Sequence, residues 1–273
     1  MAVAYERRGA GEPLVLIHGL GGTRRIWEPV LDRLAARCDV VAVDLPGFGE
    51  SPPLPDGPDG DPPTAARLGR SVSELCAELG IERPHVAGNS LGGWAALEIA
   101  KAGGAASVCA ISPAGLWRRP LGPRRVDSRG WAHRLRPLLP LLLASRRARR
   151  AMLATTVARP DLLSTAEAKA LVYGWLTAPG YDAANHEMRA HVFEHPEQVE
   201  VPTTIAWGTA DRLVAPPRRE RMPPQAEYVE LPGLGHTPTW DDPERVAELL
   251  LAAGPYSGSG SGLVSPGQAP VAR

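Results

Sequence analysis

The feature that most constrains the fold of this chain is a series of short, almost continuously apolar runs that alternate with segments of helical pattern. The runs are rich in valine and isoleucine and cover residues 13–19, 39–47, 83–90, 106–113, 203–209 and 226–233. Such runs are typical of strands that are covered on both faces, as in a parallel sheet. The alternation predicts an α/β fold with a doubly wound, mostly parallel sheet. Residues 3–8 have the pattern of an additional, antiparallel edge strand.

Helical segments are expected between these runs, at residues 26–36, 64–79, 91–102, 217–222 and 243–253. The alternation stops between about residues 114 and 200, where the pattern predicts several helices in succession. An insertion of this size between two strands indicates a helical cap over one edge of the sheet. We therefore expect a core formed by residues 1–113 and 200–253, a helical cap or lid formed by residues 114–199, and a disordered tail, rich in glycine and serine, at residues 254–273.

Composition and charge indicate which partners and which compartment to expect. Basic and acidic residues number 30 each, so nothing in the net charge favours nucleic acid. Three cysteines (Cys38, Cys76 and Cys109) lie in apolar contexts without a C-x-x-C pair, which is typical of buried free thiols in a reducing compartment. The N-terminus lacks the apolar region of a signal peptide, and the most apolar run, residues 137–144, is too short to span a bilayer. We expect a cytoplasmic monomer or homodimer without an integral membrane segment.

A glycine-flanked serine occupies the junction between an expected strand and an expected helix. The sequence there is Gly-Asn-Ser-Leu-Gly, with Ser90 at its centre. At a tight strand-to-helix turn the serine must adopt a strained backbone conformation, and neighbours without side chains let the strand and the helix approach each other. The hydroxyl of Ser90 would then project above the carboxyl end of the sheet. The backbone N–H of Leu91, at the start of the helix, would face any negative charge that develops there.

A serine needs a base to become a good nucleophile, and the sequence offers His236. His236 follows the last expected strand, and Asp211 follows the strand before it, so both are expected at the edge of the sheet where Ser90 lies. A buried carboxylate at Asp211 would orient the imidazole and stabilise its charged form. Asp241 and Asp242 are the other acids near His236, but they look like the beginning of the final helix, with Asp242 as its N-cap before Pro243.

A second oxyanion donor is expected in the sequence His-Gly-Leu-Gly-Gly, at the carboxyl end of another strand. The backbone N–H of Leu20 is our candidate, and His18 is interpreted as a structural residue that holds this loop. Asp44 begins a glycine-rich turn and is expected to bond local backbone amides. The chain lacks a nucleotide-binding glycine motif, and we interpret the closely spaced His186, His191 and His195 as an exposed polar surface rather than a metal site. No cofactor and no metal are expected.

Five motifs, taken together and in this order, resemble those of the α/β-hydrolase superfamily over about residues 3–252. They are HGLGG (18–22), DLPGFGES (44–51), GNSLGG (88–93), GTADRLV (208–214) and GLGHTP (233–238). The resemblance implies Ser90 as the nucleophile, Asp211 as the acid, His236 as the base, and Leu20 and Leu91 as oxyanion donors. The serine motif is similar to those of small carboxylesterases and of meta-cleavage-product hydrolases, which cleave carbon–carbon bonds. A serine at position 90 argues against the epoxide hydrolase and haloalkane dehalogenase branches, which use an aspartate there.

The expected cap has aromatic residues and a strong local charge. Trp117, Trp131, Tyr173 and Trp175 are candidates for lining an apolar substrate pocket. Between residues 118 and 150 there are eleven arginines and one acidic residue, interleaved with leucines. Three interpretations of this segment stay open. It is a solvated cap surface, a site that attracts carboxylate-bearing or phosphopantetheine-linked substrates, or a contact with a membrane surface.

These patterns together predict a serine hydrolase, most similar to carboxylesterases, that cleaves an ester or related acyl bond of a small, largely apolar substrate through an acyl-enzyme. Hydrolysis of a carbon–carbon bond is an alternative reaction on the same residues, and so is acyl transfer to another acceptor, including perhydrolysis. A second alternative is a ligand sensor or signalling protein that keeps the fold and the triad but hardly turns over. The sequence does not identify the natural substrate.

Overall fold

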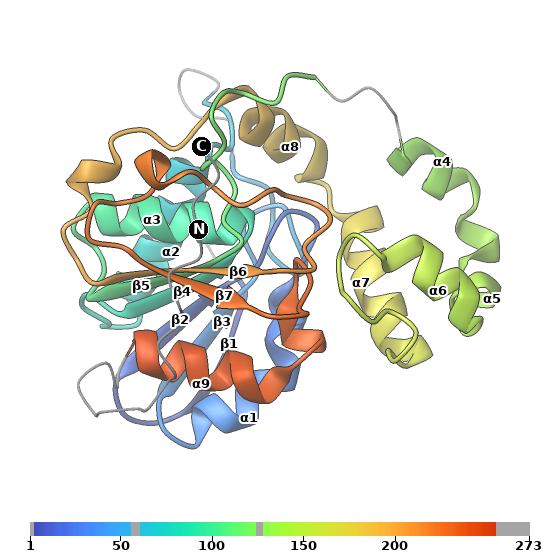
Figure 1. Cartoon of the computed structure of the whole chain (residues 1–273), viewed down its shortest axis with the longest axis horizontal. Helices are drawn as coiled ribbons and strands as arrows, with labels where there is room; N and C mark the ends of the chain where they lie inside the picture. The colour runs from blue at the N-terminus through green and yellow to red at the C-terminus, as the bar shows by residue number, and fades with distance from the viewer. Residues whose placement is uncertain (1–2, 56–60, 124–127, 255–273) are drawn as a thin grey trace.

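A seven-stranded sheet in the order β1-β3-β2-β4-β5-β6-β7 lies at the centre of the computed structural model (Figure 1). Residues 3–55, 61–123 and 128–254 are described by the structure, so residues 255–273 of the expected tail lie outside the described part. All neighbouring strands are parallel except β1, which pairs antiparallel with β3. The strands are β1 (Tyr5–Gly9), β2 (Pro13–Ile17), β3 (Asp39–Val43), β4 (His85–Asn89), β5 (Ser107–Ile111), β6 (Thr203–Gly208) and β7 (Glu227–Leu231). The expected sheet, including its antiparallel edge, is confirmed.

Helices cover both faces of this sheet, as expected of a doubly wound fold (Figure 1). On one face lie α2 (Ala65–Glu78) and α3 (Leu91–Lys101), and on the other lie α1 (Glu28–Ala35) and α9 (Pro243–Ala253). Each face has its own apolar cluster against the sheet. Every residue of β3, β5 and β6 is buried, because these strands are covered from both sides.

One expected helix of the core is wrong, and another begins differently from the prediction. The segment 217–222 contains only the short 3₁₀ turn η4 (Arg219–Arg221). Prolines at 216–217 and 223–224 bracket it, and a proline disfavours helical backbone in the residue before it and supplies no N–H donor. The segment 26–36 begins as the 3₁₀ helix η1 (Arg24–Trp27) and continues as α1.

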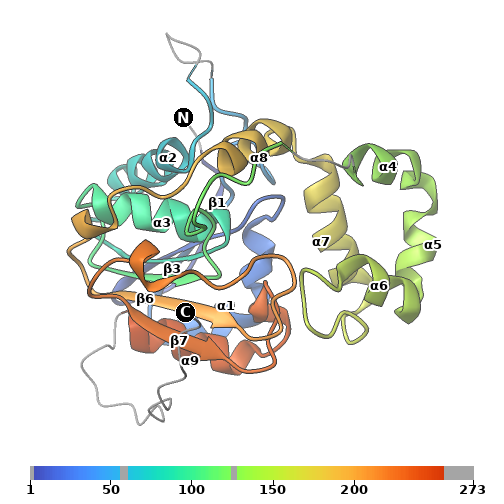
Figure 2. The same ribbon diagram turned by 45° about the horizontal axis from the view of Figure 1, so that its top comes forward.

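The insertion between β5 and β6 is helical, as expected. We call residues 114–199 the insertion. Its elements are α4 (Ser128–Arg134), η2 (Arg136–Leu138), α5 (Leu139–Ala144), α6 (Arg146–Leu153), α7 (Thr165–Thr177), α8 (Tyr181–Ala190) and η3 (Pro196–Gln198). Helices α4 to α7 stand to one side of the sheet, whereas α8 lies along the core near α2 (Figures 1 and 2).

A separate apolar cluster lets the insertion hold its own shape. The cluster consists of side chains from α5 to α7 and the connecting loops, namely Leu139, Leu143, Leu153, Val157, Leu163, Ala168, Val172 and Leu176. Helix α7 begins with a capping box, in which Ser164 and Glu167 satisfy each other's backbone N–H groups. Within the described residues, no helix is long and apolar enough to cross a membrane.

Candidate active site

Ser90 occupies the turn between β4 and α3 in a strained backbone conformation. Its φ of 55° and ψ of −117° lie outside the regions that non-glycine residues usually adopt, which costs of order 1–3 kcal/mol. Hydrogen bonds on both sides hold this conformation. The N–H of Ser90 donates to the carbonyl of Ile111 at 2.9 Å, and its own carbonyl accepts from Trp94 and Ala114 at 3.1 and 2.9 Å. The turn thus has the geometry that was expected of a nucleophile elbow.

The glycines beside Ser90 are required by close packing of the backbone. A Cβ at Gly88 would lie 2.2 Å from the carbonyl oxygen of Gly92, and one at Gly92 would lie 2.3 Å from the carbonyl oxygen of Ile17. Any side chain at these positions would push α3 away from β4 and β2. The expectation that these glycines let the strand and the helix approach each other is confirmed.

Asp211 and His236 are joined by a buried hydrogen bond. Nδ1 of His236 lies 2.8 Å from Oδ2 of Asp211, and both side chains are almost fully buried. The Oδ1 of Asp211 accepts the backbone N–H groups of Leu213 and Val214 at 2.8 and 3.0 Å. Burial raises the pKa of Asp211, but the His236 contact and these N–H groups outweigh it, so the pKa lies below its usual value.

The partnership with Asp211 decides which nitrogen of His236 can accept a proton. An ionised carboxylate only accepts hydrogen bonds, so Nδ1 must carry the hydrogen and the neutral ring presents a lone pair at Nε2. Nε2 is buried and has no hydrogen-bond partner among the described residues. Ser90 and His236 both line one cavity, so this free acceptor belongs to the same site as the serine hydroxyl.

Asn89 connects the turn at Ser90 with the loop that bears His236. Its Nδ2 donates to the carbonyl of His236 at 2.8 Å and to the carbonyl of Ile111 at 3.1 Å. The side chain is buried, so these bonds fix two loops that are far apart in the sequence. Sequence patterns do not single out Asn89, because its hydrogen-bond partners come from distant segments.

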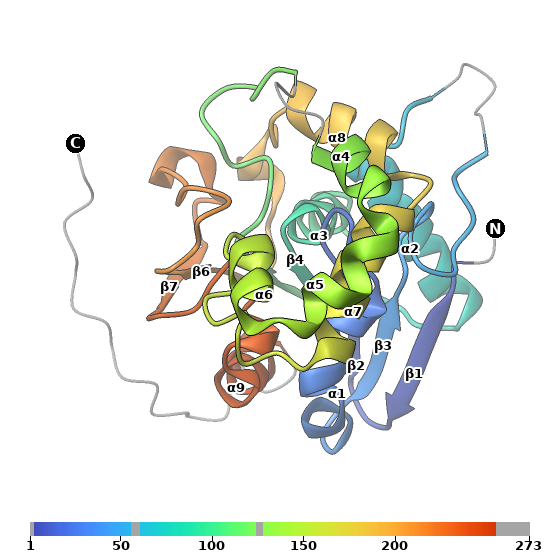
Figure 3. The ribbon, with the colours of Figure 1, turned by 90° about the vertical axis from the view of Figure 1, so that its right-hand side faces the viewer.

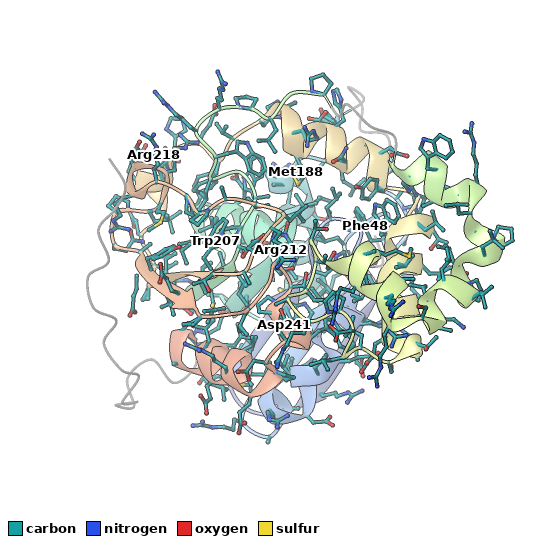
Figure 4. All side chains as sticks on the ribbon, turned by 45° about the vertical axis from the view of Figure 1, so that its right-hand side comes forward. Phe48, Met188, Trp207, Arg212, Arg218 and Asp241 are labelled. Carbon is teal, nitrogen blue, oxygen red and sulfur yellow. The ribbon has the colours of Figure 1, made fainter. Side chains whose placement is uncertain are left out.

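Asp241 has a role that differs from the one expected for the acids after His236. Asp242 is the N-cap of α9 and accepts from the N–H of Arg245 at 3.1 Å, as expected. The buried Asp241 instead accepts three backbone N–H groups, from Gly235 at 2.8 Å, from Ala158 at 3.0 Å and from Arg159 at 3.1 Å. Its carboxylate therefore fastens the insertion to the loop of His236 (Figure 4).

The loop after β2 lies directly against Ser90. A Cβ at Gly19 would come within 2.9 Å of the Cβ of Ser90, and Leu20 lines the cavity beside it. In the part of the chain that the structure describes, neither the N–H of Leu20 nor that of Leu91 has a hydrogen-bond acceptor. Leu91 is the first residue of α3, where N–H groups have no partner within the helix.

His18 and Asp44 form hydrogen bonds with the backbone of nearby loops, as expected from the sequence. Nδ1 of His18 lies 2.7 Å from the carbonyl of Gly19, and its Nε2 accepts from the N–H of Leu45 at 2.9 Å. Burial lowers the pKa of His18, which favours this neutral form. Asp44 accepts the N–H groups of Glu50 and Arg24 at 3.0 and 2.6 Å and also contacts the guanidinium of Arg24.

A cavity of about 460 Å³ lies between the core and the insertion, with Ser90 and His236 in its wall. Most of its other lining residues are apolar, and several come from α6, α7 and α8, namely Met152, Leu153, Leu171, Val172, Trp175 and Met188. Figure 4 shows Met188 among the side chains of this region. A substrate bound here would touch both the sheet loops and the insertion.

Two of the four aromatic residues proposed for the pocket are found there, and two are not. Trp117 and Trp175 line the cavity. Trp131 is 62% exposed on α4, outside the cavity, because α4 lies on the outer side of the insertion. Tyr173 does not line the cavity either, because it packs against the apolar cluster of the insertion.

The remaining histidine, cysteine and acidic residues form no second candidate site in the described ranges. No group of histidine, cysteine, aspartate or glutamate residues has the arrangement of a metal site there. His186, His191 and His195 are exposed, and the last lies beyond the end of α8. The three cysteines are free and buried, as expected.

Comparisons with known proteins agree with this architecture. A model of the alpha/beta hydrolase family matches residues 14–249. A dihydrolipoyllysine-residue acetyltransferase component of an acetoin cleaving system from Pseudomonas putida is 32% identical over 250 residues, which are 89% of this chain and 63% of that protein. The chain therefore spans less than two thirds of the length of this relative.

Two further relatives match over most of their own length. The epoxide hydrolase EphH of Mycobacterium tuberculosis is 32% identical over 204 residues, which are 69% of this chain and 94% of that protein. A structure of a thermophilic esterase from Thermogutta terrifontis superposes with a TM-score of 0.68 at 25% identity and covers 91% of both chains. The family match over most of the chain, together with the sheet order and the strained serine turn, shows that this chain belongs to the alpha/beta hydrolase family.

Proposed function

We propose that the protein is a serine hydrolase that cleaves an ester or a related acyl bond of a small, largely apolar substrate. The observation that carries this proposal is the buried, unpartnered Nε2 of His236, which shares a cavity with Ser90 while Nδ1 is bound to Asp211. A base that is oriented by a carboxylate and shares a cavity with a serine fits the arrangement that activates a hydroxyl nucleophile.

In the proposed reaction, Nε2 of His236 takes the hydroxyl proton as Oγ of Ser90 attacks the carbonyl carbon. The resulting oxyanion is held by the N–H groups of Leu20 and Leu91, and the protonated His236 then gives its proton to the departing alcohol. Water next attacks the acyl-enzyme with His236 again as the base, which releases the acid and restores Ser90. Loss of one oxyanion donor is expected to cost about 2.7–4 kcal/mol of transition-state stabilisation.

The apolar lining of the cavity and its size support an acyl chain or a similar apolar group as the part of the substrate that is bound. The similarity to an esterase over 91% of the chain supports an ester as the bond that is cleaved. The similarity to an epoxide hydrolase does not favour epoxide opening, because the residue at the centre of the turn is a serine and not the aspartate of that branch. The three buried free thiols support a reducing, cytoplasmic environment.

The test is covalent labelling by a fluorophosphonate probe together with turnover of p-nitrophenyl esters of increasing acyl length. We expect the wild-type protein to be labelled and to turn over, and Ser90→Ala to do neither. Ser71→Ala is the matched control, because the hydroxyl of Ser71 bonds the carbonyl of Arg67 within α2, away from the cavity. Labelling without turnover would support the ligand sensor instead, and a wild-type protein that is not labelled would contradict the serine mechanism.

A meta-cleavage dienoate separates ester hydrolysis from the cleavage of carbon–carbon bonds. We expect slow or no turnover of the dienoate by a protein that hydrolyses esters rapidly. Faster turnover of the dienoate than of every ester would replace the proposed reaction with the carbon–carbon alternative while keeping the same catalytic residues. Added alcohol acceptors would reveal acyl transfer as a new ester product.

A further inference from the structure

The outer side of α4 and α5 exposes a row of large apolar side chains. Trp131, Leu135, Leu138 and Leu141 are 62%, 44%, 52% and 75% exposed. Their spacing of four, three and three residues places them along one side of successive helical turns. Backbone hydrogen bonds from Leu135 to Trp131 and from Leu138 to Leu135 continue these turns between the helices. We call these four residues the outer apolar row.

The opposite side of the same helices is packed. Leu139 and Leu143 of α5 are buried in the apolar cluster of the insertion, against α7. Figure 3 shows α4 and α5 foremost, with α7 behind them, on the side of the molecule that faces away from the sheet. Helix α5 therefore has an apolar inner side that is covered, whereas the outer apolar row stays exposed in the described part of the chain.

Arginines without acidic partners flank the outer apolar row. Between residues 118 and 150 the chain has eleven arginines and one acidic residue, although its net charge is zero. Among the described residues, no carboxylate forms an ion pair with the exposed Arg134, Arg136 or Arg147, whereas Arg129 and Arg150 pair with Asp182 and Asp161. The guanidinium of Arg134 also lies 5.3 Å from the centre of the Trp131 ring. The exposed apolar surface is thus bordered by free positive charge.

We propose that the outer apolar row docks onto an anionic lipid surface. Leucine and tryptophan side chains enter the boundary between headgroups and acyl chains, where tryptophan is favoured, and arginines bind the phosphates above them. The outer apolar row and its flanking arginines supply both kinds of group. The positive charge of these arginines favours an anionic lipid surface over an uncharged membrane. Docking leaves the cavity unobstructed, because none of the four residues of the outer apolar row lines it.

In this proposal the insertion has two roles, because it encloses the cavity and also binds the lipid surface. Helix α7 contributes Val172 and Trp175 to the cavity wall and also packs against α5. A lipid surface that holds α5 would therefore lie one helix away from the cavity. The inference itself does not depend on the catalytic roles of Ser90 and His236, because it concerns binding alone.

The experiment is sedimentation of the full chain with vesicles of phosphatidylcholine alone and of phosphatidylcholine mixed with phosphatidylglycerol. We expect binding to the anionic vesicles, weakened by added salt, and little binding to the neutral ones. The double variant L138S/L141S should bind the anionic vesicles at least about tenfold more weakly, because two apolar side chains no longer enter the lipid. R134Q/R136Q should also lose about tenfold or more.

Leu162→Ser is the matched control, since Leu162 is 66% exposed in the same insertion but lies outside the outer apolar row. We expect it to bind vesicles like the wild type. Quenching of tryptophan fluorescence by brominated lipids gives a second readout that needs no leucine variant, and Trp131→Phe should remove most of it. The proposal is overturned if the wild type does not bind anionic vesicles or if L138S/L141S binds them unchanged. A wild-type dimer that L138S/L141S converts into monomers, without vesicle binding, would assign this surface to a second copy of the chain and would also overturn it.

Discussion

Replacing Asp241 by alanine should loosen the insertion from the core and disturb the loop of His236 at the same time. The substitution removes the acceptor of three backbone N–H groups, of which that of Gly235 is buried and those of Ala158 and Arg159 are partly buried. A buried donor left without a partner costs about 1–3 kcal/mol, and part of this cost is recovered where water reaches the donors. We therefore expect the free energy of unfolding to fall by about 3–4 kcal/mol, a large part of the 5–15 kcal/mol that is usual for a folded domain.

The same substitution should also lower kcat. Gly235 precedes His236 directly, and the N–H of the next residue, Thr237, donates to the carbonyl of Thr156 in the insertion at 2.8 Å. Without Asp241, this junction keeps fewer bonds to hold the imidazole in place. A displacement of about 1 Å at a catalytic group costs about 100-fold. We expect kcat for a p-nitrophenyl ester to fall by about 10-fold to 100-fold, at a temperature where the variant remains folded.

Asp242→Ala is the matched control, because the neighbouring acid caps α9 with a bond to Arg245 and forms no hydrogen bond with the described residues of the insertion. Loss of an N-cap costs about 1 kcal/mol, and kcat should be unchanged. Urea unfolding and steady-state kinetics on both variants compare the two roles. If the two alanine variants lost the same free energy of unfolding, or if Asp241→Ala kept the wild-type kcat, the connecting role of Asp241 would be refuted.

Four further predictions concern buried groups of the core. Asp211→Asn should reduce kcat by about 1,000-fold to 10,000-fold, because the amide no longer favours the correct tautomer of His236; steady-state kinetics measure this, and a loss below tenfold would contradict it. Because the folded-state pKa of Asp211 is lowered, the stability that it contributes is complete above its unfolded value of about 3.8 and is lost as the pH falls through the folded pKa. Urea unfolding of Asp211→Asn should therefore depend less on pH below about 4 than that of the wild type, and equal slopes would argue against the shift. Ser90→Gly should unfold at a higher urea concentration than Ser90→Ala, because glycine adopts a φ of 55° without strain, and the opposite order would show that the turn is relaxed. Burial raises the pKa of Cys76 to about 11 and that of Cys109 to about 12, so neither thiol should react with iodoacetamide at pH 8 until the protein is unfolded, as mass spectrometry would show.

Local patterns were sufficient to predict the sheet and the turn at Ser90. A buried parallel strand requires a nearly continuous apolar run, and each of the six runs became a strand of the sheet. The glycines beside Ser90 predicted a close approach of two backbone segments. The structure confirms it between Gly88 and Gly92. The order of the strands placed Asp211 and His236 at one edge, and a hydrogen bond joins them.

Contacts between distant segments could not be predicted in this way. Whether an aromatic side chain of the insertion faces the cavity depends on how each helix is rotated and packed. The composition alone did not distinguish Trp175, which lines the cavity, from Trp131, which is exposed on the outside. Asp241 looked like part of a helix start, because its N–H partners at Ala158 and Arg159 lie about 80 residues earlier in the chain.

The sequence by itself therefore determined the strands of the sheet and the polar groups that follow β4, β6 and β7 at its carboxyl edge. These depend on residue periodicity and on backbone rules that act over a few positions. The tertiary structure alone decided the shape of the cavity, the partners of Asn89 and Asp241, and which side of α4 and α5 stays uncovered. Each of these depends on packing between segments that the chain brings together only when it folds, and no local pattern carries that information.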